Sequence, residues 1–381
     1  MKIGVVVPYS FAFFGGVVEH ALEQARALSD RGHDVRVLIG NDPPGRLTRL
    51  LHPTAGRFDR PPSHVIPLGR SVITPANHSL ANIVLSPSAV PRIRRGLARE
   101  RFDLLHIHEP MTPAIGVAAL ALATVPVVAT FHAAGPSRWR GFAAKMWGFL
   151  LERIDVRIAV SEAAAETART YAPGNYLIVP NGVRLPPPPT LSSRRPQVVF
   201  VGRHEPRKGL SVLLRAWPRV HAATGARLRV VGADPLAVRY LIARERLISE
   251  GVDLLGALSG DELERELADA KLLVAPSLGA ESFGMVLTQA FAAGTPVVAS
   301  DIDGYRRVAG EQTGALVPPG DADALAAAAM GLLRDEGHRL ACAASARAVA
   351  ERDYAWPRIA GSLEVVYRGL VSVPGEAEAA A

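Results

Sequence analysis

Residues 279 to 300 have the composition of a ligand-binding turn followed by a helix. Glu281 provides a carboxylate among small residues, and a helix is expected over Gly284 to Phe291. The N-terminus of a helix attracts phosphate oxygens, because its backbone N–H groups are unpaired and carry partial positive charge. Gly284 lets the backbone approach a ligand, and Gln289, farther along the helix, can contact another part of an extended ligand. This combination suits a sugar nucleotide, with an ordinary loop and a half-buried helix as the alternative.

A second candidate segment is cationic and directly follows a strand expected at Gln197 to Val201. Arg203, Arg207 and Lys208 lie at its C-terminal end, where ligands of open α/β sheets bind. The chain has only four lysines, so one at this position is informative. Arg binds phosphate oxygens bidentately and Lys acts as a mobile point charge, so together they can stabilise a diphosphate leaving group without a metal. A solvated charge run is the alternative.

Near the N-terminus, Gly15 and Gly16 join a strand expected at Ile3 to Val7 to a helix beginning near Val17. Paired glycines allow backbone N–H groups to approach a phosphate. His132 ends another expected strand and points toward the same cleft, although a single histidine is as often structural.

Short β-branched runs alternate with Ala-rich amphipathic stretches, which is typical of parallel sheets with crossover helices. A chain of 381 residues with 49% hydrophobic content can bury two cores. The expected fold class is α/β, with two doubly wound domains facing a cleft. We expect strands at Ile3–Val7, Val35–Ile39, Leu104–Ile107, Val127–Phe131, Arg157–Val160, Gln197–Val201, Arg227–Val231, Val252–Leu254, Leu272–Val274, Val297–Ala299 and Ala315–Val317.

The domain boundaries follow from this pattern. We place an N-terminal domain at 1–184, a Pro-rich linker at 185–196 and a C-terminal domain at 197–356. Four consecutive prolines at 186–189 favour a stiff, extended linker. A helix at 357–373 is expected to pack back on the N-terminal domain, and 374–381 has the composition of a disordered tail.

Composition excludes several classes of protein. The single cysteine excludes an internal disulfide framework and a Cys-based zinc site. The apolar run before Pro8 is too short for a secretory signal, so a cytoplasmic protein is expected. Met111 to Phe131 is uncharged, but Pro126 divides it into a helix and a strand, which disfavours a membrane span. The net charge of +7 favours phosphates or anionic lipid, while the lack of zinc-finger or RNA-binding signatures disfavours nucleic acid.

A basic, partly amphipathic stretch lies at Val90 to Arg101 and contains five arginines. Clustered basic side chains near an anionic membrane contribute roughly 1 kcal/mol each. A solvated helix face is the alternative. The hydrophobic loop Phe11 to Phe14 suits either a lipid acceptor or buried packing.

These motifs together resemble the retaining GT-B glycosyltransferases of family 4. The resemblance rests on Gly15-Gly16, Leu-His-Ile-His-Glu-Pro at 105–110, Phe131-His132, Pro-Asn-Gly-Val at 180–183, Gly202-Arg203 with Arg-Lys-Gly at 207–209, and Glu-Ser-Phe-Gly at 281–284. It extends over about residues 1 to 370. Within the family, residues 3–11, 106–110 and 300–303 most resemble the phosphatidyl-myo-inositol mannosyltransferases of actinobacteria.

The resemblance implies a role for each matching residue. Gly16 would contact the donor diphosphate through its backbone, and Arg203 and Lys208 would neutralise it. Glu281 would hold donor-sugar hydroxyls, His132 would contact the sugar near the reacting carbon, and Gln289 would receive the ribose. The predicted catalytic residues are His132, Arg203, Lys208 and Glu281. The predicted donor-binding residues are Gly15, Gly16, Gly202, Arg203, Lys208, Glu281, Ser282, Phe283, Gly284, Met285, Val286 and Gln289. The predicted acceptor or membrane residues are Tyr9, Ser10, Arg92, Arg94, Arg95 and Arg207.

The implied activity is transfer of a hexose, with mannose from GDP-mannose as first candidate, to the inositol of a phosphatidylinositol-type lipid. No cofactor or metal is expected, and the enzyme would bind peripherally to the anionic inner face of the plasma membrane. Two positions depart from the family pattern. Gln289 stands where a second glutamate is usual, and Ala12 stands where the mannosyltransferases carry an acid.

Three alternatives stay open. The first is a UDP-sugar-dependent enzyme of the same family that acts on inositol phosphate or a polyprenol-linked glycan. The second is a sugar-nucleotide epimerase, and the third and weakest is a non-catalytic lectin-like binder. The sequence leaves the oligomeric state undetermined.

Overall fold

The computed structural model describes residues 1–13, 15–51, 61–76, 79–86, 88–135, 138–187 and 194–371. It divides the chain into an N-terminal unit, Met1–Gly182 with Trp356–Ala381, and a C-terminal unit, Val183–Ala355. The predicted boundaries at 184 and 356 lie beside these crossing points. Phe14, linker residues 188–193, residues 372–373 of the predicted last helix and the predicted tail at 374–381 lie outside the described residues.

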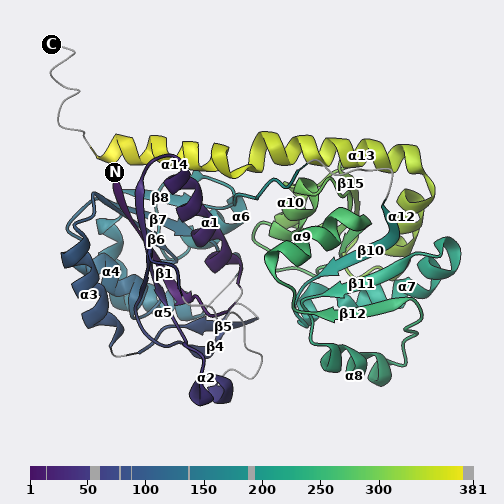
Figure 1. The fold of residues 1–381 in the computed structure, drawn as a ribbon, viewed down its shortest axis with the longest axis horizontal. Coiled ribbons are helices and arrows are strands. Elements are labelled where there is room, and N and C mark those ends of the chain that lie inside the picture. Colours follow the sequence, from purple (N-terminus) through teal and green to yellow (C-terminus); the bar gives the residue numbers. More distant parts are fainter. Residues whose placement is uncertain are drawn as a thin grey trace, which may run out of the picture. The chain divides into compact units, whose positions relative to one another are not determined.

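The main sheet of the N-terminal unit is parallel, with the strand order β3-β2-β1-β6-β7-β8-β9 (Figure 1). These strands are β1 Lys2–Ser10, β2 Asp34–Gly40, β3 Val65–Pro67, β6 Leu104–His108, β7 Val127–Phe131, β8 Val156–Ala159 and β9 Leu177–Ile178. A hairpin of β4 Val72–Ala76 and β5 Ser79–Ile83 joins β1 through an antiparallel pairing of Tyr9 with Ile83.

Helices pack on both faces of this sheet. The side chains of β1 alternate between the two faces, so this strand contributes to the core on each side. Ile3, Val5 and Val7 share a core with α1 Gly16–Asp30 and with the last helix, α14 Trp356–Leu370. Val6 faces a second core, which includes residues of α3 Ala89–Glu100 and α4 Ile115–Leu122. The remaining helices are α2 Arg46–Leu51, α5 Arg138–Trp147, α6 Glu162–Arg169 and the 3₁₀ helix Gly148–Arg153.

The C-terminal unit contains a six-stranded parallel sheet with the order β12-β11-β10-β13-β14-β15. Its strands are β10 Arg195–Val201, β11 Arg227–Val231, β12 Val252–Gly256, β13 Ala270–Ala275, β14 Val297–Ser300 and β15 Gly314–Val317. Its helices are α7 Leu210–Thr224, α8 Pro235–Glu245, α9 Gly260–Asp269, α10 Met285–Ala292, α11 Asp303–Arg306, α12 Ala322–Arg334 and α13 Glu336–Val349, with a 3₁₀ turn at Pro206–Lys208 and a π turn at Ala350–Tyr354.

Both sheets reverse their strand order at the first strand of the unit. In the N-terminal unit the reversal lies between β1 and β6, and in the C-terminal unit between β10 and β13. This is the order of doubly wound nucleotide-binding folds, in which the crevice beyond the carboxyl ends of those two strands receives the ligand. The expected α/β class of two doubly wound sheets is confirmed. Among the described residues, no helix has the length and apolar character needed to cross a membrane.

Candidate functional site

In the C-terminal unit, the predicted cationic and acidic segments meet beyond the carboxyl ends of β10 and β13. Glu281 Oε1 accepts hydrogen bonds from Arg207 Nη1 at 2.6 Å and pairs with Lys208 Nζ at 2.7 Å. These three side chains are only 12% to 18% exposed. The sequence places Glu281 more than 70 residues from the two cations, so the fold alone brings them together.

Glu205 extends this network toward solvent. Its carboxylate pairs with Arg203 Nη2 at 2.9 Å and with Arg207 Nη2 at 2.9 Å. Arg203 is half exposed, at 54%, unlike its partners. Three cations thus surround two carboxylates, which leaves a surplus of positive charge for an anionic ligand. Sequence reasoning assigned Glu205 no role, although it lies within the predicted cationic segment.

Backbone contacts fix the two segments against each other. Leu278 N donates to Arg207 O at 2.7 Å. Gly209 has φ +69°, and a Cβ at this position would lie 1.8 Å from Pro276 O. Only glycine therefore allows the turn after Lys208 to pass so close to the end of β13. Gly202, predicted to bind the donor, begins this turn directly after β10.

Ser277 and Tyr305 support Glu281 from the protein interior. Ser277 Oγ lies 3.3 Å from Glu281 Oε1 and 2.9 Å from Tyr305 Oη. Burial, and secondly the nearby Glu281 carboxylate, raise the pKa of Tyr305 well above its usual range. The phenol therefore stays protonated and can donate a hydrogen bond. The sequence offered no signal that would connect Tyr305 to this site.

Gly284 has a packing reason besides the one we predicted. It precedes α10 with φ +88°, and a Cβ there would lie 2.7 Å from the ring of Tyr305. The space beside Gly284 is therefore occupied by an aromatic side chain of the protein, and the approach of a ligand to its backbone remains a prediction. Among the other predicted donor residues, Phe283 is buried against Tyr354, whereas Ser282, Met285, Val286 and Gln289 are half-buried.

In the N-terminal unit, Gly15 and Gly16 are exposed at the start of α1, and no side chain of the described residues caps this helix. Gly15 has an ordinary extended backbone, and a Cβ there would meet nothing within 4 Å. The two glycines therefore leave the N-terminus of α1 open to a ligand. This arrangement is the one expected of a phosphate contact.

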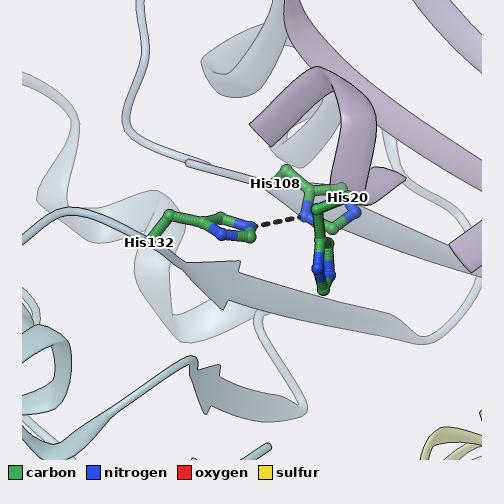
Figure 2. A group of neighbouring side chains, drawn as sticks. All are labelled: His20, His108 and His132. Carbon is green, nitrogen blue, oxygen red and sulfur yellow. Dashed lines mark hydrogen bonds between the residues drawn. The ribbon is translucent and has the colours of Figure 1, made fainter. Parts of the chain in front are cut away.

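His132 is one member of a buried cluster of histidines rather than an isolated side chain. Figure 2 shows it beside His108 and His20, which come from the end of β6 and from α1. His132 Nε2 lies 2.8 Å from His108 Nδ1, so one ring donates a hydrogen bond to the other. His20 contacts both rings edge-on, with centroid distances of 5.1 and 5.5 Å. His106 stacks on His108 at 4.7 Å.

Burial keeps this cluster neutral. It lowers the pKa of His20 to about 4 and that of His106 to about 3. Burial, and secondly the neighbouring histidines, also lower the pKa values of His108 and His132 well below the usual range. Neutral imidazoles are able to bind a metal ion, and one nitrogen from each of His20, His108 and His132 lies within 4.8 Å of the others. However, the short contact between His108 and His132 shows two rings that already bind each other.

Glu109 and Tyr367 hold the cluster in place. Glu109 Oε1 accepts hydrogen bonds from the backbone N–H groups of His132 at 2.8 Å and Ala133 at 2.9 Å. His106 is hydrogen-bonded to Tyr367 and, at 2.6 Å, to Thr130 Oγ1. His106 and His108 lie two residues apart on a strand and so share one face of the sheet, a signal that would have pointed to this pairing. His20 lies in α1 among apolar residues, and nothing in the local sequence indicates that it belongs to the cluster.

The predicted acceptor residues lie in different settings. Tyr9 and Ser10 end β1, and the buried Ser10 Oγ accepts a hydrogen bond from Ala12 N at 3.3 Å. Phe11 and Phe13 are buried, which favours the packing alternative for this loop. Arg92, Arg94 and Arg95 are exposed on α3. Arg207, predicted on the acceptor side, instead pairs with Glu281 and Glu205 in the C-terminal unit.

Comparisons with known proteins identify the family of this chain. A family model described as glycosyltransferase family 4 matches residues 14–185, and one described as glycosyl transferases group 1 matches residues 195–335. The phosphatidyl-myo-inositol mannosyltransferase of Mycobacterium leprae is 37% identical, and its alignment covers 96% of each chain. The chain belongs to glycosyltransferase family 4. The enzyme of the same name from Mycolicibacterium smegmatis is 36% identical over 96% of this chain and 93% of its own.

Solved structures agree on the fold. Anabaena HepE in complex with UDP and glucose superposes with a TM-score of 0.72 at 22% identity, covering 97% of this chain and 100% of its own. Sucrose-phosphate synthase from Thermosynechococcus elongatus gives a TM-score of 0.72 at 22% identity, covering 97% and 98%. The protein is therefore a glycosyltransferase of GT-B architecture. In each unit, the cluster at the strand-order reversal is a candidate functional site of that unit.

Proposed function

We propose that this family 4 glycosyltransferase transfers mannose from GDP-mannose, with retention of configuration, to the inositol of a phosphatidylinositol-type lipid at the cytoplasmic face of the membrane. The observation that carries the proposal is the similarity to enzymes named phosphatidyl-myo-inositol mannosyltransferase over nearly the full length of both chains. The geometry of the C-terminal unit supports it, because a half-buried lysine and two arginines suit a diphosphate.

In this proposal, catalysis is electrostatic. Lys208 and Arg203 stabilise the negative charge that develops on the departing diphosphate. Glu281 is held by Arg207 and Lys208, so its carboxylate is positioned to accept hydrogen bonds from hydroxyl groups of the sugar. The acceptor hydroxyl attacks from the face that the diphosphate leaves, and a phosphate oxygen takes its proton. We propose no metal, since the cations supply the charge neutralisation that a metal would provide.

A donor panel tests this function. Purified protein would receive phosphatidylinositol with GDP-mannose, GDP-glucose or UDP-sugars, with and without EDTA. We expect mannosylated lipid from GDP-mannose at the same rate in EDTA. Transfer only from UDP-sugars would favour the alternative donor, and conversion of a nucleotide sugar without acceptor would indicate an epimerase.

Lys208→Met tests the role of the half-buried lysine. We expect turnover to fall about 10²-fold or more, because a charge acting on the transition state is lost. Lys271→Met is the matched control, because Lys271 lies near the amino-terminal end of β13 and Lys208 lies beyond the carboxyl ends of the strands. Wild-type turnover in Lys208→Met would contradict the mechanism.

A further inference from the structure

A cavity of about 480 Å³ lies in the N-terminal unit, and none of its lining residues belongs to the histidine cluster. Its volume is within the range of about 300 to 1,000 Å³ that is usual for small-molecule sites. Its polar lining consists of the side chains or backbone of Asn41, Gly69, Arg70, Ser86, Ser88 and Arg92. These residues come from the loops after β2, β3 and β5 and from the start of α3.

The charge of this cavity is uncompensated among the described residues. Arg70 is half-buried and donates through Nη1 to Thr48 Oγ1 at 3.0 Å, but it forms no ion pair with a described carboxylate. Arg92 likewise has no described acidic partner and is exposed. The neighbouring Asp42 is buried, and its oxygens accept hydrogen bonds from Ser71 N and, at 2.6 Å, from Ser71 Oγ. Two arginines without a described acidic partner therefore line a cavity that has room for an anion.

The shape of the cavity depends on a glycine. Gly69 has φ +153°, and a Cβ there would lie 3.2 Å from Ser86 Cβ. Asn41 N donates to Gly69 O at 2.8 Å, and Ser86 Oγ lies 2.8 Å from Ser88 Oγ. The close approach of these loops brings hydroxyl groups to the same cavity as the two arginines. Guanidinium and hydroxyl donors around one space are the chemistry that binds phosphate oxygens.

The location of the cavity connects it to the acceptor. Asn41 directly follows β2, whose last residue, Gly40, pairs with Ser10 at the end of β1. The cavity therefore lies beyond the carboxyl ends of the strands, where the predicted acceptor residues Tyr9 and Ser10 also lie. Arg92 also belongs to the exposed basic face of α3, which would meet an anionic membrane.

We propose that this cavity binds the phosphodiester of the acceptor lipid, and that Arg70 selects phosphate-bearing acceptors over neutral ones. The proposal rests on the proposed function, since it names the site that recognises the headgroup. A lipid phosphodiester held by Arg70 and Arg92 would place the attached inositol near the carboxyl ends of the strands.

Acceptor kinetics of Arg70→Gln test this proposal. The acceptors would be phosphatidylinositol and a neutral lipid in which an ether replaces the phosphodiester, both in the same detergent micelles with GDP-mannose. We expect the KM for phosphatidylinositol to rise about 10- to 100-fold, as expected for loss of a charge-assisted hydrogen bond, while the KM for the ether lipid does not change. Arg358→Gln is the matched control, because it removes the same charge from an exposed position on α14.

Equal effects on both acceptors, or no effect on either, would overturn the proposal. Direct binding separates it from the proposed function: wild-type protein should bind glycerophosphoinositol by calorimetry and Arg70→Gln should not, even if no mannose is transferred. Inorganic phosphate provides the other arm. Tighter binding of inorganic phosphate than of glycerophosphoinositol would identify a free-anion site and contradict a lipid-headgroup site.

Discussion

Glu281 is at the centre of a chain of contacts that connects the mostly buried cations Arg207 and Lys208 to the buried phenol of Tyr305. Arg207 and Lys208 bind its carboxylate from one side, and Ser277 connects it to Tyr305 on the other. Tyr305 in turn packs where a side chain at Gly284 would lie. The position of the carboxylate therefore depends on the packing of Tyr305 beside Gly284.

Gly284→Ala should destabilise the C-terminal unit by about 1–3 kcal/mol. The reason is twofold: φ +88° is unfavourable for alanine, and the new methyl group would lie 2.7 Å from the Tyr305 ring. Urea unfolding measures the change. Gly310→Ala is the control, because a Cβ there meets nothing within 4 Å and its φ is not in the left-handed region. Equal stabilities of the two variants would contradict the packing argument.

Which site residues the sequence could predict depends on local signals. Lys208 was identifiable because its cationic segment directly follows an expected strand, and Glu281 because it lies in a small-residue turn before the N-terminus of an expected helix. Tyr305 and His20 lie within helices, where nothing local shows what they contact. Their part in the site comes from tertiary packing alone. The roles of the predicted site residues remain predictions.

At the scale of elements, α3 separates its residues by charge. Ala89, Ile93 and Gly96 are buried against the sheet, whereas its four arginines, Arg92, Arg94, Arg95 and Arg99, are exposed. Among the described residues, no salt bridge involves these four arginines, although Arg99, after Lys2 and Arg36, contributes to lowering the pKa of Glu100. A helix with one buried face and one unneutralised basic face is suited to lie against an anionic bilayer.

The triple variant Arg94→Gln, Arg95→Gln, Arg99→Gln should bind anionic vesicles about 100-fold more weakly than wild type. Each charge contributes roughly 1 kcal/mol near such a surface, and 1.4 kcal/mol is about tenfold. Co-sedimentation with phosphatidylserine-containing vesicles measures this. The control triple Arg239→Gln, Arg265→Gln, Arg307→Gln removes the same charge from exposed positions in the C-terminal unit. An equal loss in the control would show that net charge alone governs binding.

The sequence predicted the parallel strands because they are short runs rich in β-branched residues between turn signals. All eleven expected strands are present, with bounds that differ by a few residues at most. The strands that we did not predict are β3, β4, β5 and β9. They have at most five residues and lie toward the edges of the sheet or in a hairpin. β3, β4 and β5 contain proline or polar residues, and β9 has only two residues. Their pairing depends on neighbouring strands that local sequence does not reveal.

At the scale of the whole molecule, acid adds charge to a chain that already carries +7. The N-terminal unit is the sensitive part, because it buries four neutral histidines around β6 and β7. In the unfolded chain each takes up a proton below pH 6.5, whereas the folded pKa values of His20 and His106 are about 4 and 3. The unfolded state therefore binds more protons in this range, and stability falls as the pH falls.

Between pH 6.5 and 5, each of His20 and His106 should cost the folded state on the order of 2 kcal/mol, at about 1.4 kcal/mol per pH unit and proton. Urea unfolding followed region by region with hydrogen exchange should show β6 and β7 losing protection before β10 and β13. His20→Phe should reduce the pH dependence by about one proton, because phenylalanine removes one titrating group without opening the cluster. His338→Gln, at an exposed position of α13, should not change it. A pH dependence that is identical in wild type and His20→Phe would mean that the buried histidines do not control acid stability.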